Sequence, residues 1–392
     1  MRDLVRSVVA LAVCTALLAC DRNAGDRNGS ATDGAPPELR TALAARTVYP
    51  AKREEWRTDI TQHTDSTMEP RVFRASGTTV ALLQASPQRI SIFELNRHGL
   101  LLSTRPARID PVLNAQVPRD LVAPTELSRV TDDGQVDIID SASSILMRES
   151  IGGFVFRRDL PMLRGGSGRL CTVSPATLLH VRNLGARRTL EAFTITALAT
   201  EDSLLGRHRF TGLSGQRLRF GTGDARRCLL LAERETIVVS APDGPGPSAT
   251  PRIAPLRAPG SAAPATIDST AGIGASDSRQ SLQPIIVDAA VVDGGFVVLV
   301  GLESDRYGRM LDYYDERGEY LQSAWLPFTA SAMTGSGPRF LLLHQDAGLH
   351  WWLSSWLTPM AARGATAPPE PRQVTRAPGK QLFELPSRAK KP

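Results

Sequence analysis

The chain has 392 residues, of which 42% are hydrophobic and 22% are charged, as in an ordinary globular protein. This length suits one large domain or two modest ones. The formal net charge is +6, but the basic residues are mostly arginines scattered among aspartates and glutamates. Charge spread in this way is typical of a solvated surface, so it argues against nucleic acid as a partner.

The N-terminus has the pattern of an export signal. Arg2 and Arg6 precede a short apolar run over residues 8–18, and a bilayer span needs about 20 apolar residues. The pattern therefore predicts a signal peptide over residues 1–19. The run ends in Leu-Leu-Ala-Cys at Cys20, which resembles the lipobox of bacterial lipoproteins. An ordinary secretory signal, in which Cys20 is incidental, is the alternative.

The lipobox resemblance implies cleavage before Cys20, acylation of its thiol and attachment to a membrane. Asp21 follows the cysteine, and it resembles the signal that retains enteric lipoproteins at the periplasmic face of the inner membrane. The outer membrane is the alternative. Residues 20–40 are mostly polar and rich in glycine, so we expect a lipidated flexible tether there.

Short apolar runs bounded by glycine, proline, aspartate and asparagine recur along the rest of the chain, which predicts an all-β fold. The unit over 285–327 contains four predicted strands in about 40 residues, the size of one propeller blade. A second unit over 70–102 combines a proline, a glycine before an apolar strand, Arg-Ile-x-x-Phe at Arg89–Phe93, and a polar turn that ends at Gly99.

This second unit is similar to the repeat of NHL-type six-bladed β-propellers. The resemblance implies a β-propeller over residues 41–358, built from six blades of four-stranded antiparallel sheets. Residues 47–60 are the candidate for the strand that closes the ring. Five, seven or eight blades, or a pair of β-sandwiches, are the alternatives.

Two segments are expected to lie outside the blades. Residues 241–281 are rich in proline, alanine, glycine and serine, which predicts a disordered insertion. Residues 359–392 form a proline-rich tail with basic residues at its end, and we expect it to be mobile.

Once Cys14 leaves with the signal and Cys20 carries lipid, Cys171 and Cys228 remain. Exported proteins fold in an oxidising compartment, so these two cysteines are predicted to form a disulfide. Two buried free thiols are the alternative.

No catalytic, cofactor-binding or metal-binding motif is apparent in the sequence, and we expect no cofactor. Some six-bladed propellers are calcium-dependent lactonases or esterases, which makes a metal-dependent hydrolase or lactonase with its site at the propeller axis the alternative function. The acidic candidates for calcium binding are Glu303, Asp305, Asp312, Asp315 and Glu316. Solvated turns are the other interpretation of these residues.

Aromatic residues crowd the last third of a chain that is otherwise poor in them. Tyrosine and tryptophan dominate binding hot spots, so Tyr307, Tyr313, Trp351 and Trp352 are candidate partner-binding residues; packing between blades is the other interpretation. Trp351 and Trp352 are adjacent, so on a strand they face opposite sides. We therefore expect a monomeric, membrane-anchored, non-catalytic scaffold that binds an envelope protein or peptide.

Overall fold

In the described part of the chain, the protein is built almost entirely from β-strands. The computed structural model describes residues 45–51, 54–64, 70–85, 88–106, 126–131, 133–140, 145–150, 153–160, 168–174, 177–187, 190–199, 204–211, 218–224, 226–232, 235–241, 251–257, 259, 284–301 and 307–360. One short 3-10 helix, η1, accompanies the strands at Thr61–His63.

The first half of the chain forms three separate four-stranded antiparallel sheets. Unit 1 contains β3 (Pro70–Ser76), β4 (Thr79–Ala85), β5 (Gln88–Leu95) and β6 (Leu101–Pro106). Unit 2 contains β7 (Glu126–Val130), β8 (Val136–Asp140), β9 (Ile145–Ser150) and β10 (Gly153–Asp159). Unit 3 contains β11 (Gly168–Ser174), β12 (Thr177–Arg187), β13 (Leu190–Ala199) and β14 (Leu204–Thr211).

The second half adds one more separate sheet and an eight-stranded one. Unit 4 contains β15 (Arg219–Phe220), β16 (Arg227–Leu231), β17 (Thr236–Ser240) and β18 (Arg252–Pro255). The eight-stranded sheet contains β19 (Ile285–Val292), β20 (Gly295–Gly301), β21 (Gly308–Asp315), β22 (Tyr320–Ser336), β23 (Arg339–Gln345), β24 (Trp351–Leu357), β1 (Val48–Pro50) and β2 (Glu54–Asp59).

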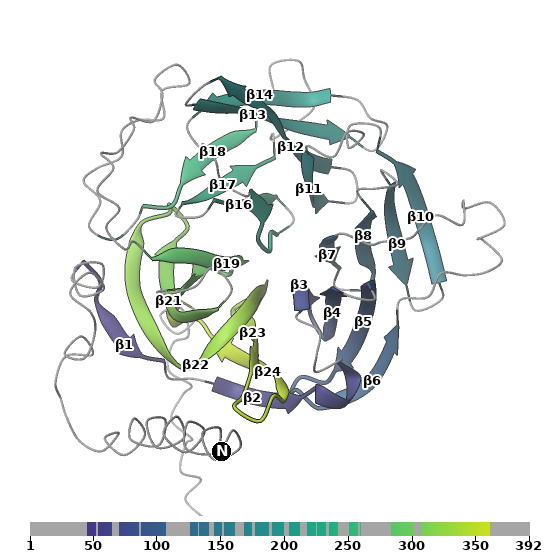
Figure 1. Cartoon of the computed structure of the whole chain (residues 1–392), viewed down its shortest axis with the longest axis vertical. Helices are drawn as coiled ribbons and strands as arrows, with labels where there is room; N and C mark the ends of the chain where they lie inside the picture. The colour runs from purple at the N-terminus through teal and green to yellow at the C-terminus, as the bar shows by residue number, and fades with distance from the viewer. Residues whose placement is uncertain are drawn as a thin grey trace, which may run out of the picture.

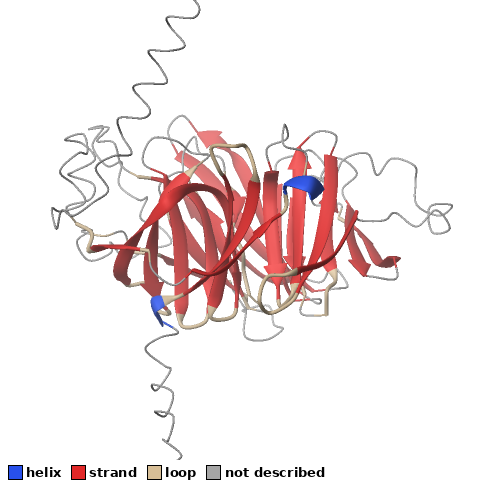
Figure 2. Cartoon of the chain, turned by 90° about the horizontal axis from the view of Figure 1, so that it is seen from below, coloured by secondary structure: helices blue, strands red, loops and turns tan. Residues whose placement is uncertain are grey.

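Strand β22 is shared between two units of the large sheet. Most of its first half pairs with β21, and its second half pairs with β23. Unit 5 is therefore β19, β20, β21 and the first half of β22, and unit 6 is the second half of β22, β23, β24 and β2. The six units form a ring around a central axis, with β3, β7, β11 and β19 among the strands nearest to it (Figure 1), and in side view most strands cross the thickness of the ring (Figure 2). This arrangement is a β-propeller; the blade count of the whole chain stays a prediction.

An early strand closes the ring. Strand β2 pairs antiparallel with β24, from Glu54 opposite Trp356 to Asp59 opposite Trp352. Residues 47–60 thus supply the closing strand, as the sequence suggested. Within the same segment, β1 pairs in parallel with β22 and extends unit 5 at its outer edge.

A buried ion pair fixes the start of β1. The Arg46 guanidinium donates to both carboxylate oxygens of Asp312 at 3.0–3.2 Å, and the two side chains are 9% and 2% exposed. Ser323 also donates its hydroxyl to Asp312. The chain is therefore held against unit 5 before it crosses to unit 6.

The core consists of one apolar cluster at each contact between neighbouring units. In the described part of the chain there are six such clusters. The cluster between units 3 and 4 contains Cys171 on β11 and Cys228 on β16, which form a disulfide. The predicted bridge is confirmed, and it joins two blades.

One prediction about the blades is wrong. Residues 241–281 were expected to lie outside them, but Arg252–Pro255 form β18, the outer strand of unit 4. Ile253 packs against the apolar cluster between units 3 and 4. A proline at the end of an edge strand is tolerated because no further strand needs its missing N–H, so the proline-rich composition concealed this strand. The rest of the segment, apart from residues 241, 251, 256, 257 and 259, lies outside the described residues.

Candidate functional site

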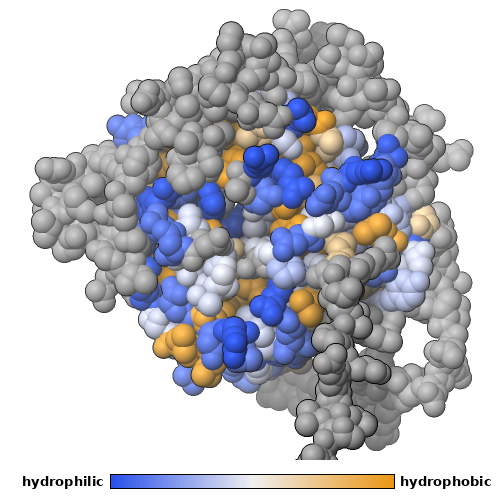
Figure 3. All heavy atoms as spheres, turned by 180° about the vertical axis from the view of Figure 1, so that it is seen from behind, coloured by the Kyte–Doolittle hydropathy of each residue, from blue (hydrophilic) through white to orange (hydrophobic). Residues whose placement is uncertain are grey.

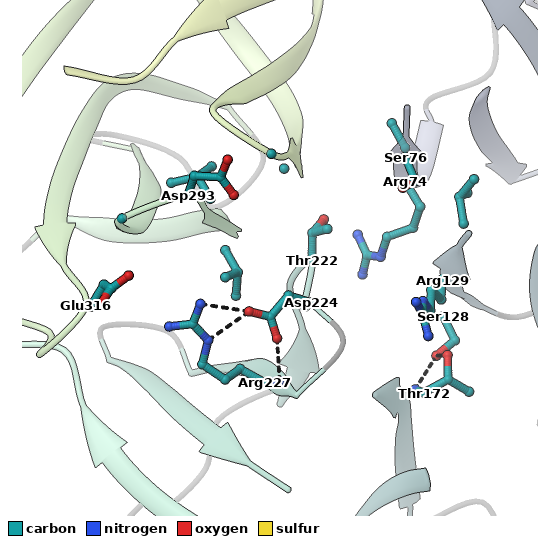
Figure 4. A pocket seen from close by; sticks show the side chains of 18 residues that line it. Arg74, Ser76, Ser128, Arg129, Thr172, Thr222, Asp224, Arg227, Asp293 and Glu316 are labelled. Carbon is teal, nitrogen blue, oxygen red and sulfur yellow. Dashed lines mark hydrogen bonds and ion pairs between the residues drawn. The ribbon is translucent and has the colours of Figure 1, made fainter. Parts of the chain in front are cut away.

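A cavity of about 480 Å³ opens at one mouth of the central axis. All six units contribute to it through the ends of their innermost strands or the turns that follow. The lining side chains labelled in Figure 4 are Arg74, Ser76, Ser128, Arg129, Thr172, Thr222, Asp224, Arg227, Asp293 and Glu316. The volume lies in the range of ordinary ligand sites, roughly 300–1,000 Å³.

Hydroxyl groups of the inner strands hydrogen-bond across unit boundaries at this cavity. Ser128 on β7 lies 2.8 Å from the Thr172 hydroxyl on β11 and also accepts the backbone N–H of Thr172. Thr222 donates to Thr334 on β22, which in turn accepts the N–H of Ala75 on β3. These bonds tie inner strands of different units together, so the cavity wall is held in a fixed shape.

A charged cluster lies among the inner strands next to the cavity. Asp288 on β19 accepts the N–H groups of Met333 and Ala289. Burial raises the pKa of Asp288, and the positive charges of Arg74 and Arg219 oppose this shift. Arg74 donates to the Phe220 carbonyl at 2.7 Å. The role of this cluster is structural, because it connects units 1, 4, 5 and 6.

The structure places the four candidate aromatic residues in different environments. Tyr313 and Trp351 are 4% and 2% exposed and belong to apolar clusters between blades. They are core residues and offer no surface to a partner, because blade contacts need large side chains to fill them. Trp352 is half-buried and donates its ring N–H to Asp346, so the expected alternation of Trp351 and Trp352 is confirmed. Tyr307 is 39% exposed and lies away from the cavity lining.

The acidic candidates for calcium do not converge on one place. Asp312 is held by Arg46 and Ser323. Asp315 accepts the backbone N–H groups of Arg317 and Glu319 in a turn, and Glu316 lines the cavity. Glu303 and Asp305 lie outside the described residues. Across the described ranges, no group of three or more His, Cys, Asp or Glu side chains is placed to hold a metal ion.

Several predictions fall on parts of the chain that the structure does not describe. The signal peptide, Cys20, Asp21, the tether and residues 361–392 lie outside the described residues. Within those that are described, no helix has the length and apolar character needed to cross a membrane. Among the residues coloured in Figure 3, most of those on the face shown are hydrophilic, and the apolar ones form separate patches.

Sequence reasoning missed the residues that line the cavity, apart from Glu316. Arg74 and Arg129 look like the other scattered arginines of the chain. Both arginines lie near the end of the first strand of a blade unit, and in a propeller this position faces the central axis. That position is the signal that sequence reasoning could have used. Recognising it requires the register of each blade, which the sequence of the weaker repeats does not provide.

No family model matches the chain, and neither does any curated protein. Among solved structures, the chain is similar to a streptogramin B lyase, with 11% identity over 77% of this chain and 87% of that chain and a TM-score of 0.41. It is also similar to virginiamycin B lyase from Staphylococcus aureus, with 10% identity over 77% and 98% and a TM-score of 0.43. A third is regucalcin, a calcium-binding protein from Agrobacterium tumefaciens, with 11% identity over 79% and 95% and a TM-score of 0.37. Likenesses this distant carry no argument about what this chain does.

Proposed function

We propose that the protein is a monomeric lipoprotein of the bacterial cell envelope, whose NHL-like, six-bladed propeller binds a protein or peptide without catalysing a reaction. The lipobox resemblance at Cys20 supports export and attachment to a membrane through lipid. Asp21 supports the periplasmic face of the inner membrane.

The observation that carries the binding role is the cavity at the axis. It is concave, held in shape by hydrogen bonds between blades, and lined by charged groups of both signs and by hydroxyls. Polypeptide segments present charges and amide groups of the kind that such a lining recognises. A volume of about 480 Å³ holds a few residues and not a folded domain, so the partner would insert a chain end or a loop.

The test is chemical crosslinking in intact envelopes that carry the lipidated protein, followed by identification of what co-purifies. The variant Ser76→Arg places a long side chain on the cavity wall. Its matched control is Ser103→Arg, because Ser103 is exposed on β6 away from the cavity. Cys20→Ala removes the site of lipid attachment.

We expect one specific partner with the unchanged protein and with Ser103→Arg, and its loss with Ser76→Arg and with Cys20→Ala. A partner that is retained by Ser76→Arg would show that the cavity is not its site. If the unchanged protein captures no partner, the envelope-binding role is wrong.

A further inference from the structure

The cavity at the axis carries opposite charges on opposite walls. Arg74 of β3 and Arg129 of β7 lie on one side in Figure 4, and Asp293 and Glu316 lie on the other. Between them, Arg227 and Asp224 form an ion pair at 2.7 Å and contribute little net charge. The buried carboxylate of Asp288 lies near Arg74 and offsets part of its charge. Arg129, Asp293 and Glu316 therefore carry most of the charge difference between the walls.

The positive wall is built into the ring. Arg74 is 4% exposed and donates to Phe220 of unit 4, and Arg129 donates to the Val173 carbonyl of unit 3 at 3.3 Å. A guanidinium has five N–H donors in a planar fork, and this bond of Arg129 uses one of them. The same wall presents the hydroxyl-bearing side chains of Ser76 and Ser128. Such a wall matches a carboxylate, which accepts two parallel hydrogen bonds from a guanidinium.

The negative wall consists of two turn residues. Asp293 follows β19, and Glu316 lies in the turn between β21 and β22. Both are exposed, and in the part of the chain that the structure describes neither has a cationic partner. These carboxylates are positioned to accept hydrogen bonds from an ammonium or guanidinium group of a ligand.

We infer that the cavity binds a short peptide segment in one orientation, with a carboxylate on Arg129, at the wall that Arg74 helps to form, and a basic group on Asp293 and Glu316. This inference rests on the proposed peptide-binding function and names the ligand class. The reverse orientation would place like charges together, which is unfavourable. The carboxylate could come from the end of a chain or from an acidic side chain, and the test separates these sources.

The test uses ligand-observed NMR titrations of the full-length protein in detergent with synthetic tetrapeptide pools. The first pool has the form acetyl-Lys-x-x-Ala, where x is any of several neutral residues, and has a free C-terminal carboxylate. The second pool is the same but amidated at the C-terminus. The third replaces lysine by norleucine, and the fourth is amidated but carries glutamate in place of the last alanine.

If the carboxylate is a chain end, the first pool binds at least tenfold more tightly than the amidated second pool, and the fourth pool stays weak. If it is a side chain, the fourth pool recovers the affinity of the first. Either result supports the inference when norleucine also weakens binding at least tenfold.

Two variants assign the walls. In Arg129→Gln, amidation of the peptide should no longer weaken binding, whereas norleucine should still weaken it. In Asp293→Asn, norleucine should no longer weaken binding, whereas amidation should still weaken it. Arg97→Gln and Glu54→Gln make the same charge changes at exposed positions outside the cavity and should alter neither.

Equal binding of all four pools, or the same response from both wall variants, would overturn the oriented ligand while peptide binding itself stands. If no pool binds, both the inference and the peptide-binding function are wrong.

Discussion

At the scale of single residues, His344 is a buried titratable group whose Nε2 has no hydrogen-bond partner among the described residues. It lies on β23, is 2% exposed and stacks on Phe328 with ring centroids 3.7 Å apart. Burial lowers the pKa of His344 to about 4, and the positive charge of Arg57 acts in the same direction. The imidazole is therefore neutral in the folded protein at pH values where it is already protonated in the unfolded chain.

This arrangement predicts a loss of stability in mild acid. Between pH 6.5 and about 4 the unfolded state binds a proton at His344 that the folded state does not, so the free energy of unfolding falls as the pH falls. The loss is up to about 3 kcal/mol at 1.36 kcal/mol per pKa unit. Urea titrations at several pH values should show a shallower pH dependence for His344→Gln than for the unchanged protein. Equal slopes for the two proteins would contradict the prediction.

At the scale of elements, two glycines let β19 lie close to the inner segments of units 4 and 6. A Cβ at Gly221 would be 2.4 Å from the Ala289 carbonyl oxygen, and one at Gly335 would be 2.0 Å from that of Val291. On one side, Thr222 and Ala290 form a parallel β-bridge between units 4 and 5. On the other side, Gly335 belongs to the half of β22 that starts unit 6. The inner strands of three blades therefore meet through backbone contacts.

Gly335→Ala should consequently destabilise the fold, because the added methyl group meets backbone atoms that cannot rotate away. We expect a loss of about 1–3 kcal/mol, as for other overpacked sites, measured as a shift in the midpoint of urea unfolding. Gly348→Ala is the matched control, since its nearest contact is a side-chain oxygen of Asp346 at 3.2 Å in an exposed turn. If Gly335→Ala were as stable as the control, the close approach of β19 and β22 would not matter.

At the scale of the whole molecule, the described part of the ring is held by six apolar clusters, by β2 and by one disulfide. The disulfide joins Cys171 and Cys228 across 57 residues, and their neighbours Thr172 and Arg227 line the cavity. It therefore links two blades directly behind the candidate site.

Replacing both cysteines by alanine should lower the free energy of unfolding by about 4 kcal/mol, the value that loop entropy gives for a bridge of this span. Alanine is chosen because both sites are apolar and buried. Urea unfolding of the double variant, and of the unchanged protein under reducing conditions, should give similar losses. A loss below about 1 kcal/mol in either case would mean that the apolar cluster alone holds these blades together.

Local patterns predicted the fold well, whereas the site needed the three-dimensional arrangement. Units 1 and 5 have short apolar runs bounded by turn residues, so their strands follow from sequence. Tyr313 resembles a surface aromatic in sequence, and its burial depends on a blade contact with Phe340 of β23. The cavity was not predictable because its walls come from all six units, and residues as distant in sequence as Arg74 and Asp293 line one cavity only once the ring has closed.

The double use of the N-terminal segment has a mechanical consequence. A pull on the chain ahead of Arg46 first meets the ion pair with Asp312 and the hydrogen bonds of β1 with β22. The closing strand β2 lies beyond this point along the chain and pairs with a different blade. Tension applied through the N-terminus is therefore borne by β1 and the Arg46–Asp312 ion pair. The pairing of β2 with β24, which closes the ring, remains intact until these contacts have broken.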